Sequence, residues 1–599
     1  MTQQKKVKKN VTDICFIVCP DYWAYTPSLA VATLAGVLKY AKYRVKIADI
    51  NVAFQRRYNI YPDNFSKMMN SMWNPLDTIE IKKKLLCHLL ARRPLKSLPD
   101  DIKEHNISQQ LLFHYNFFRE YYLDEVAESS EVLGFTIIAD NLLCSLAVIN
   151  LIKTNHPDKK IVVGGPECHS FNAMEVLKLS PNINMICGSD GEIALLNYLN
   201  SINGKTSEES GYLIQVNGSW KDYGERKLTN REFNKFGVMA DFSEFPLHLY
   251  LVPGLLPLVT SRGCTSKCIF CSERLLYSPY RRISANNLKE TLIRIKDEYS
   301  PSKIKFADSL LNGSRKIFDE FLKVLKQVNW KIPWEGNMRA DNIDDKHFKL
   351  LRETNCRKIF CGIETMIPNV LRDMKKEVSL TNATETIKAA HDNGIKVHGY
   401  LIVGFPGEKT GDYMKTLPLL FELDSFYTHV ITFRYLPSEG QDEIYRKFKL
   451  RPSLDFEKFL DRENDPPPIN HYILKNYLRS NFFTDKNGYD FYDRTLRQIY
   501  SMQLLNMAQH GQRDEHDISM EFIKRYDWLP FRVDKPRHAD NRFIFYGREI
   551  KSKNKLENDI LASMNGKNTI KQIVKELTTE QTDKDGIYTS VYEVFNRLL

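Results

Sequence analysis

The sequence predicts an α/β protein of several domains, in which a doubly wound parallel sheet is followed by a partial (β/α)6 barrel and a C-terminal helical and winged-helix region. Three observations lead to this class. The length of 599 residues is about four times that of a typical domain. Strand and helix patterns alternate in two separate stretches of the chain. Beyond them, the last part changes to short amphipathic helices.

The composition excludes several other classes. Apolar residues make up 43% and charged residues 27%, as in globular proteins. The net charge of +11 is spread over a long chain, and the basic runs 5–9 and 82–84 are typical of solvated faces, so no nucleic-acid partner is expected. No apolar run approaches the ~18 residues of a membrane span, and residues 1–10 are too polar for a secretory signal. We therefore expect a cytoplasmic protein without a membrane partner.

Residues 1–200 alternate strand and helix patterns, which predicts a parallel sheet. Helices are expected at 31–38 and 142–153. Residues 58–128 form a helical insertion with a break near 94–100, and the polar residues 201–250 are expected to be a linker. The strands of the sheet are expected at 13–19, 44–49, 132–138, 161–163 and 185–187.

Residues 251–440 contain six more strand patterns separated by helices, which predicts a partial barrel with its active site at the C-terminal ends of the strands. Residues 441–533 are expected to be helical. Residues 534–599 predict a hairpin around Gly547 and three short helices at 556–564, 569–577 and 591–599, a winged-helix pattern. The barrel strands are expected near 256–261, 303–308, 333–338, 358–363, 396–403 and 430–435.

A cysteine cluster directly follows the first barrel strand. Cys264, Cys268 and Cys271 have the spacing C-x3-C-x2-C, whereas the 11 cysteines of the chain are too sparse for a disulfide scaffold. Three thiolates on one loop can hold three irons of a 4Fe-4S cluster and leave the fourth iron open to a ligand. A zinc site usually takes a fourth Cys or His at short spacing, and none follows Cys271 closely.

With Phe270 before its third cysteine, this motif resembles that of the radical S-adenosylmethionine (radical SAM) superfamily, whose catalytic domain is a TIM-like barrel. The resemblance implies that the open iron binds S-adenosylmethionine. An electron from a reducing partner such as flavodoxin or ferredoxin then cleaves it to a 5′-deoxyadenosyl radical. Further strings that resemble this superfamily stand at 303–308, 337–341, 361–365, 371–375 and 404–408.

The resemblance also implies which barrel residues bind S-adenosylmethionine. Glu364 is expected at the ribose hydroxyls and Arg339 at the methionine carboxylate, and Asp308 is a further candidate. Gly404 and Gly407 would let the backbone approach the adenine. Ordinary ion pairs at the strand ends are the alternative interpretation for the charged residues.

The ends of the N-terminal strands are rich in glycine and small polar residues, and a doubly wound sheet binds its ligands at that edge. Together with the order of the domains, this pattern resembles the cobalamin-binding domain that precedes the barrel in one class of radical SAM enzymes. The resemblance implies that the cobalamin-binding residues are Thr136, Gly164, Gly165, Gly188 and Asn51.

One departure from that class concerns the lower ligand of cobalt. Many cobalamin domains supply it from the His of D-x-H-x-x-G, but this chain has Asn51 in place of the His and Phe54 in place of the Gly. We therefore expect cobalamin without a protein imidazole on cobalt. A domain that holds no cobalamin is the alternative.

Three functions remain open from the sequence. The first is a cobalamin-dependent methyltransferase acting on an unactivated carbon of a ribosomally made peptide, because residues 561–577 and the preceding hairpin resemble a leader-peptide recognition element. The second is a non-methylating cyclase or oxidoreductase, or a methylase of a small natural-product intermediate. The third, a noncatalytic iron-sulfur sensor that reads DNA, is disfavoured because the helix at 569–577 carries only Lys571 and Lys575 as basic residues.

Overall fold

The structure is a computed structural model. It describes residues 12–58 (without 21, 23 and 24), 75–408 (without 170 and 341), 429–432, 439–450, 530–532, 542–545, 548–578 and parts of 586–594. The basic run 5–9 therefore lies outside the described residues, as do most of the predicted helical region 441–533 and most of the helix expected at 591–599.

The N-terminal domain is built on a seven-stranded sheet of order β2-β1-β3-β4-β5-β6-β7. The first five strands pair in parallel, and their order is that of one common type of doubly wound fold, which confirms the predicted architecture. The helices α1 (Leu29–Tyr40) and α11 (Gly191–Ile202) pack on one face. The parallel strands are β1 (Thr12–Val18), β2 (Val45–Asp49), β3 (Ser130–Thr136), β4 (Lys160–Gly164) and β5 (Met185–Ile186).

The expected linker at 201–250 contributes to this sheet, which differs from the prediction. β6 (Leu213–Val216) and β7 (Ser219–Asp222) extend the sheet as an antiparallel hairpin. Asn217 and Gly218 between them both have positive φ, the geometry that an Asn-Gly hairpin turn requires. Further along, the backbone N–H of Asp241 donates to the carbonyl of Ala32 in α1 at 3.0 Å. The segment is therefore packed against the domain.

The insertion is helical, as predicted, and covers the other face of the sheet. Its helices are joined through the short 3-10 turn η1 (Leu95–Ser97), between Pro94 and Pro99, at the expected break. Their apolar side chains form a second core together with α8 (Leu142–Asn155). These helices are α4 (Pro75–Leu90), α5 (Asp100–Lys103), α6 (Asn106–Tyr121) and α7 (Leu123–Ser129).

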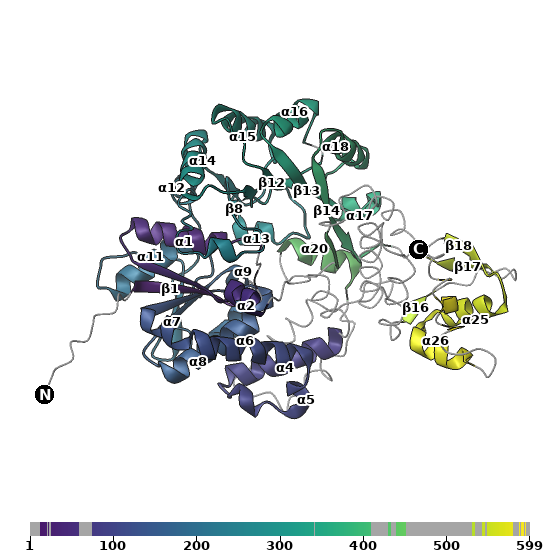
Figure 1. Cartoon of the computed structure of the whole chain (residues 1–599), viewed down its shortest axis with the longest axis horizontal. Helices are drawn as coiled ribbons and strands as arrows, with labels where there is room; N and C mark the ends of the chain where they lie inside the picture. Colours follow the sequence, from purple (N-terminus) through teal and green to yellow (C-terminus); the bar gives the residue numbers. More distant parts are fainter. Residues whose placement is uncertain are drawn as a thin grey trace.

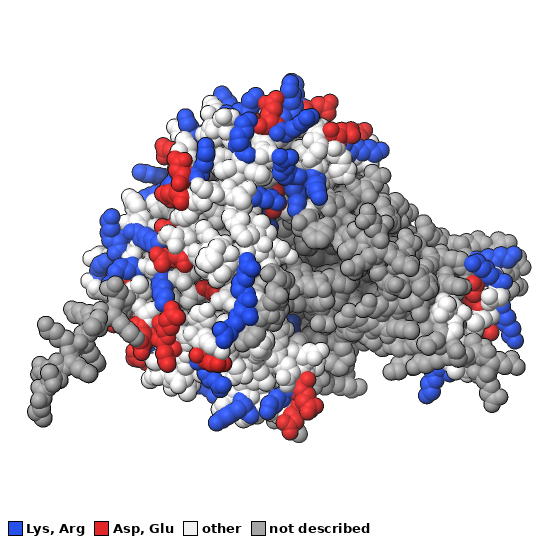
Figure 2. All heavy atoms as spheres, in the orientation of Figure 1, with Lys and Arg blue, Asp and Glu red and all other residues white. Residues whose placement is uncertain are grey.

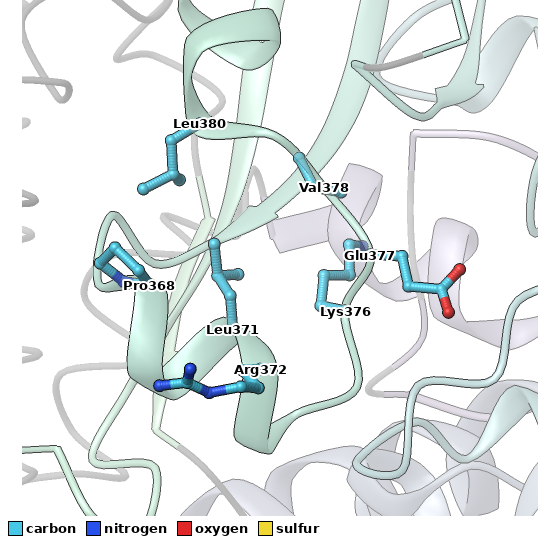
Figure 3. A pocket seen from close by; sticks show the side chains of 7 residues that line it. All are labelled: Pro368, Leu371, Arg372, Lys376, Glu377, Val378 and Leu380. Carbon is cyan, nitrogen blue, oxygen red and sulfur yellow. The ribbon is translucent and has the colours of Figure 1, made fainter.

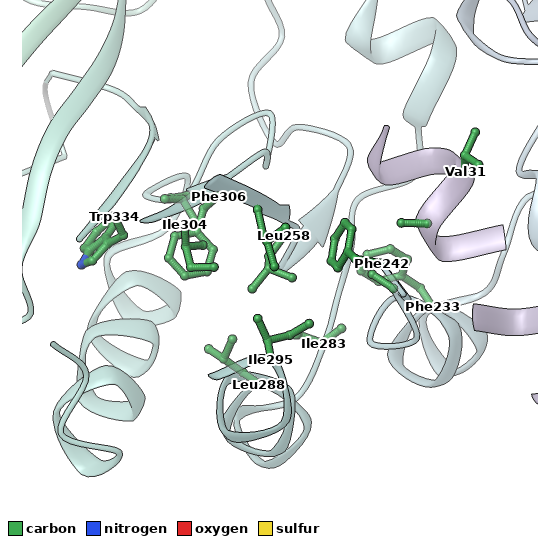
Figure 4. Packing of buried hydrophobic residues seen from close by; sticks show 14 of the residues in the cluster. Val31, Phe233, Phe242, Leu258, Ile283, Leu288, Ile295, Ile304, Phe306 and Trp334 are labelled. Atoms are coloured by element: carbon green, nitrogen blue, oxygen red, sulfur yellow. The ribbon is translucent and has the colours of Figure 1, made fainter. Parts of the chain in front are cut away.

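The second domain is a six-stranded parallel sheet of order β8-β11-β12-β13-β14-β15, so neighbours in the sheet follow one another along the chain as in a barrel. All six predicted strands are present. One face packs on helices, where Ile304, Phe306 and Trp334 join Leu288 and Ile295 of α14 in a continuous core (Figure 4). The strands are β8 (Leu255–Leu258), β11 (Lys303–Phe306), β12 (Trp334–Met338), β13 (Cys356–Glu364), β14 (Lys396–Val403) and β15 (His429–Thr432).

Helices follow most of the barrel strands and form its outer layer, drawn in teal and green in Figure 1. Several begin at a serine whose side chain caps the first turn, such as Ser284 before α14 and Ser379 before α18. The helices are α14 (Ala285–Tyr299), α15 (Arg315–Gln327), α16 (Asp345–Glu353), α17 (Pro368–Asp373), α18 (Leu380–Asp392) and α20 (Glu439–Phe448).

The C-terminal part, drawn in yellow in Figure 1, contains the predicted hairpin and the first two predicted helices. β17 (Arg542–Phe545) pairs antiparallel with β18 (Arg548–Lys551). α25 (Lys555–Ser563) and α26 (Ile570–Leu577) follow. A strand pair that was not predicted joins β16 (Pro530–Arg532) to β19 (Asn565–Thr569). The buried side chains of this unit include Ile560, Leu561, Ile573 and Val574.

Lys and Arg side chains alternate with Asp and Glu over the described part of the face in Figure 2. Within the described ranges, no helix combines the length and the apolar character that a bilayer crossing needs.

Candidate functional site

The predicted cluster cysteines lie on one loop, residues 263–280. The loop leaves the barrel through β9 (Ser261–Arg262) and returns through β10 (Arg281–Arg282), which pair antiparallel. Cys268 is buried, and Cys264 and Cys271 are half-buried. The loop is held from the barrel side, because the N–H of Ile269 donates to the carbonyl of Met374 at 3.1 Å.

The chemistry of these donors fits an iron-sulfur cluster. Burial raises the pKa of the Cys271 thiol to about 12 and also raises that of Cys268. A thiolate at this place is therefore unfavourable unless a cationic centre compensates its charge, as cluster irons do. Among the described residues, no three Cys, His, Asp or Glu side chains meet around one point as ligands of a single ion. Ligands of a 4Fe-4S cluster bind separate irons and so stand further apart.

Glu364 lies at the C-terminal end of β13 beside the cysteine loop. It is buried, and its Oε1 accepts a hydrogen bond from Lys376 Nζ at 2.9 Å. Its φ of 65° is in the left-handed region, at a register shift between β13 and β14. Such strain in a non-glycine residue persists only where the surroundings enforce it, and it is concentrated at functional sites.

Lys376 is a site residue that the sequence did not identify. Burial opposes its charged form, but the Glu364 carboxylate outweighs this effect and raises the Lys376 pKa. The Lys376 ammonium also favours the thiolate of Cys268. A side chain at Gly362 would stand 2.8 Å from Lys376 Nζ and would displace the pair. The string 371–375 ends one residue earlier, at Lys375, which instead pairs with the half-exposed Glu443 at 2.7 Å.

Arg339 follows β12 and points to the same loop. Its Nη1 donates to Ser266 Oγ at 3.1 Å, between two of the cysteines, and its Nη2 donates to the carbonyl of Glu377. Asn312 fixes the Arg339 backbone, because its side chain accepts from the Arg339 N–H at 2.7 Å and donates to the Arg339 carbonyl at 2.8 Å. The structure thus brings Arg339, Glu364, Lys376 and the cysteine loop together.

Asp308, the third charged candidate, follows β11 and is fully buried. Its carboxylate accepts hydrogen bonds from Thr260, through both N–H and Oγ1, and from Ser261 Oγ at 2.6 Å. These contacts fix the chain just before the cysteine loop. They give Asp308 a positioning role, and its contact with a cofactor stays a prediction.

The two glycines after β14 have protein neighbours. The N–H of Gly404 donates to Glu408 Oε2 at 2.6 Å. Gly407, with φ at 89°, lies so close to α20 that a side chain there would stand 2.6 Å from Phe448 Cε1. The room at Gly407 is therefore occupied by an aromatic ring, and its approach to adenine stays a prediction.

An open cavity of about 380 Å³ lies between α17 and the segment that carries Lys376 (Figure 3). Its lining is largely apolar, from α17 and the segment that leads into α18. It consists of Pro368, Leu371, Arg372, Lys376, Glu377, Val378 and Leu380.

The residues predicted for cobalamin stand in a row at the C-terminal edge of the N-terminal sheet. Thr136 ends β3, Gly164 ends β4, and Gly188 follows β5. Gly165 must be a glycine, because its φ is 113° and a Cβ there would stand 2.6 Å from the Ile137 carbonyl oxygen. The backbone of Gly165 thus passes close to that of Ile137 at this edge.

Asn51 occupies the place of the missing histidine and is bound within the protein. Its Oδ1 accepts from the Tyr22 N–H at 3.2 Å and from Gln55 Nε2 at 3.1 Å, and its Nδ2 donates to the Tyr22 carbonyl at 3.1 Å. Asp49 accepts from the buried Tyr250 hydroxyl and from the Val52 N–H. The Asn51 carboxamide therefore clamps the loop after β1, which leaves it no role as a metal ligand.

The sheet edge and the cysteine loop face each other. His169, at the end of α9 (Pro166–His169) after β4, has its ring centroid 6.5 Å from that of Tyr277 at the end of α13 (Glu273–Tyr277) in the cysteine loop. Figure 1 shows α9 and α13 at the middle of the molecule, where the two domains meet. The sheet edge after β4 therefore lies next to the cysteine loop.

Comparisons with known proteins agree with this architecture. The family model of the Radical SAM superfamily matches residues 258–420. An uncharacterized methyltransferase of Pyrococcus horikoshii is 24% identical over 303 residues, which are 50% of this chain and 65% of that protein. Cytidylyl-2-hydroxyethylphosphonate methyltransferase of Streptomyces wedmorensis is 23% identical over 46% of this chain and 58% of its own. The matches thus span less than two thirds of these relatives.

Two solved structures share the fold over nearly the whole chain. The radical S-adenosylmethionine methyltransferase TsrM of Kitasatospora setae, with cobalamin and a [4Fe-4S] cluster bound, has a TM-score of 0.56 and 14% identity, covering 98% of this chain and 99% of its own. The cobalamin-dependent S-adenosylmethionine radical enzyme OxsB, with aqua-cobalamin bound, has a TM-score of 0.54 and 14% identity, covering 98% and 80%. The chain therefore contains a radical SAM domain at residues 258–420 and shares the overall fold of the cobalamin-dependent enzymes TsrM and OxsB.

Proposed function

We propose that the protein is a cobalamin-dependent radical SAM methyltransferase that methylates an unactivated carbon of a ribosomally made peptide. In the net reaction, a substrate C–H and two S-adenosylmethionines take up two electrons from a flavodoxin- or ferredoxin-type donor. The products are the methylated substrate, S-adenosylhomocysteine, methionine and 5′-deoxyadenosine.

The observation that supports the proposal most is that the sheet edge and the cysteine loop lie opposite each other. The glycine-rich edge of the sheet faces the cysteine loop across the contact of His169 with Tyr277. The fold of TsrM and OxsB matches this chain over 98% of its length, and their structures contain cobalamin. This arrangement favours methyl transfer, because a methyl donor at the sheet edge would stand opposite the place where a substrate radical forms.

The barrel residues would bind the cluster and S-adenosylmethionine. Cys264, Cys268 and Cys271 would hold three irons of the cluster, which supplies the electron for radical formation. Lys376 holds the Glu364 carboxylate in a fixed orientation, in which it would accept from the ribose hydroxyls. Arg339, fixed over the loop by Ser266, offers its guanidinium to a carboxylate.

The sheet residues would bind cobalamin without a protein ligand on cobalt. Asn51 is committed to the Tyr22 backbone and to Gln55. Neither Asp49 nor Asn51 supplies an imidazole. Cobalamin held at this edge would supply the methyl-transfer chemistry.

The C-terminal unit supports a peptide as the substrate. The hairpin of β17 and β18 offers a strand edge, and α26 turns Ile573 and Val574 into the core of the unit. An extended leader peptide could add to that edge through main-chain hydrogen bonds. A small natural-product intermediate is the alternative substrate, as TsrM is recorded with tryptophan.

A truncation ending at Val533 tests the peptide substrate. The truncated enzyme should keep its cluster and its uncoupled cleavage of S-adenosylmethionine. It should lose micromolar affinity, about 8 kcal/mol, for a precursor peptide encoded beside its gene. Unchanged peptide turnover, or turnover of a free small molecule alone, would favour the alternative. Methyl-deuterated S-adenosylmethionine distinguishes methyl transfer from cyclisation or oxidation, because only methyl transfer carries the label into the product.

A further inference from the structure

Four charged residues join the base of the cysteine loop to the N-terminal sheet domain, and three of them, Arg281, Asp190 and Glu192, are buried. Arg262 and Arg281 stand opposite one another in the β9–β10 ladder that closes the loop. Gly263 directly after Arg262 has φ at 89°, and a Cβ there would lie 2.6 Å from the Tyr277 carbonyl oxygen. The two ends of the loop are thus packed closely against each other beside the two arginines.

Both arginines bind one carboxylate. Arg262 Nη1 lies 2.7 Å from Asp190 Oδ1, and Arg281 Nη1 donates to Asp190 Oδ2. Arg262 Nη2 also donates to Glu192 Oε1 at 2.6 Å. The side chains of Arg281, Asp190 and Glu192 are 1%, 4% and 3% exposed. The Arg262 side chain is 20% exposed. Two cations and two anions therefore balance one another in a largely buried group, in which loss of one partner leaves the others uncompensated.

The carboxylates come from the sheet edge predicted to bind cobalamin. Asp190 stands two residues after Gly188, at the start of α11, and its Oδ2 also accepts from the Leu228 N–H at 2.8 Å. Arg281 in turn donates to the carbonyls of Leu228 at 3.2 Å and Tyr277 at 2.9 Å. Burial opposes ionisation of Asp190, but Arg262 and Arg281 outweigh it and lower the Asp190 pKa.

We propose that Arg262, Arg281, Asp190 and Glu192 form a clamp that sets the cysteine loop at a fixed place opposite the sheet edge. They are positioning residues, and the clamp rests on the proposed function in that the two cofactor sites must act on one substrate. The two ends of the loop both bind Asp190, through Arg262 and Arg281. One carboxylate therefore fixes both the position and the orientation of the loop. Weakening the clamp should therefore uncouple the two sites while each site remains formed.

The test compares Glu192→Gln with Arg282→Gln in the full chain loaded with cluster and cobalamin. Glu192→Gln removes one charge of the clamp and leaves the bonds of Asp190 to both arginines. Arg282→Gln is the matched control, because Arg282 lies in the same strand β10 but pairs with Glu320 at 2.5 Å on the half-exposed surface. Asp190→Asn serves as the stronger variant.

Glu192→Gln should retain iron and corrinoid within about twofold. Methylated product per 5′-deoxyadenosine should fall at least tenfold, and the magnetic interaction between cob(II)alamin and the reduced cluster should change in its paramagnetic resonance spectrum. The control should match the wild type in all of these. An unchanged ratio of methylated product to 5′-deoxyadenosine together with an unchanged spectrum overturns the clamp. Loss of the cluster itself also overturns it, because the four residues would then be required for folding only.

A readout without cobalamin separates this proposal from the proposed function. Amides of residues 263–280 should exchange hydrogen at least tenfold faster in Glu192→Gln or Asp190→Asn than in Arg282→Gln. If the wild type binds no corrinoid, the proposed function fails while this exchange still decides the clamp. Equal exchange in the clamp variants and the control overturns it.

Discussion

The two parallel sheets of this protein differ in how many of their faces are covered by an apolar core. In β1, neighbouring residues alternate between two apolar cores, with Phe16 in one and Ile17 in the other. In β11, Ile304 and Phe306 enter the core under the helices, whereas Lys305 points to the opposite face. The N-terminal sheet is covered on both sides, while the barrel keeps one polar face.

The polar face of the barrel is a continuous feature of its strands. Glu335 of β12 forms ion pairs with Lys303 of β11 and, at 3.7 Å, with Lys358 of β13. Alternation along β13 places Gly362 on the same side as Lys358. Glu364 Oε1 lies there too, 2.6 Å from the position of a Cβ at Gly362. The sheet can therefore offer a ligand only its strand ends, whereas the barrel offers strand ends and an inner surface.

The largest expected effect comes from the cysteine loop. Replacing Cys264, Cys268 and Cys271 together with Ala should abolish S-adenosylmethionine cleavage, because the electron for this step comes from the cluster. Iron content and 5′-deoxyadenosine are measured after anaerobic reconstitution. Retained iron together with continued formation of 5′-deoxyadenosine would contradict the assignment.

Alanine substitutions in β1 and β11 test the difference between the faces. Phe16→Ala and Ile17→Ala should each lower the free energy of unfolding by about 3 to 4 kcal/mol, because both faces of β1 are apolar core. In β11, Ile304→Ala should cost as much, but Lys305→Ala less than about 1 kcal/mol. Denaturant titration measures all four. Equal losses of unfolding free energy in Ile304→Ala and Lys305→Ala would contradict the difference between the two faces of β11.

The strand end at Asp49 should respond to pH. Burial raises the pKa of the Asp49 carboxyl to about 6. The folded state thus binds more protons than the unfolded state between about pH 4 and 6, so stability falls as pH rises through this window. The charged carboxylate costs up to about 3 kcal/mol at pH 7. Asp49→Asn, which can still accept from Tyr250, should flatten this dependence. The stability that the variant gains over the wild type should be larger at pH 7 than at pH 4. A parallel pH profile in both proteins would contradict the burial argument.

The smallest expected effect concerns the end of the polar face. Glu364→Gln should weaken S-adenosylmethionine binding by about 10- to 30-fold, or about 1.4 to 2 kcal/mol, because the amide loses its charge-assisted bond to Lys376. Anaerobic calorimetry measures this affinity. Glu443→Gln breaks the neighbouring exposed pair with Lys375 and should leave it unchanged. An equal loss in both variants would speak against a binding role for Glu364.

The sequence was sufficient for those features that depend on local patterns. Alternating strands and helices predicted both sheets, and the spacing of Cys264, Cys268 and Cys271 predicted one loop. The hairpin of β6 and β7 was missed, although Asn217-Gly218 is a known turn signal, because each of its strands is only four residues long.

Features that depend on distant partners could not be predicted. Arg281 and Asp190 are 91 positions apart in the chain, and no local pattern shows that they meet. Lys376 rather than Lys375 faces Glu364, because the turn after α17 decides which of two adjacent lysines points inward. For the same reason, only the structure shows that Asn51 clamps Tyr22.

Paramagnetic resonance of the reconstituted protein tests the central claim most directly. After anaerobic loading, we expect about four irons and one corrinoid per chain. The cob(II) form should show no superhyperfine splitting from a histidine nitrogen, because Asn51 stands where the imidazole would be. Clear splitting from a protein nitrogen, or failure to bind any corrinoid, would contradict the account.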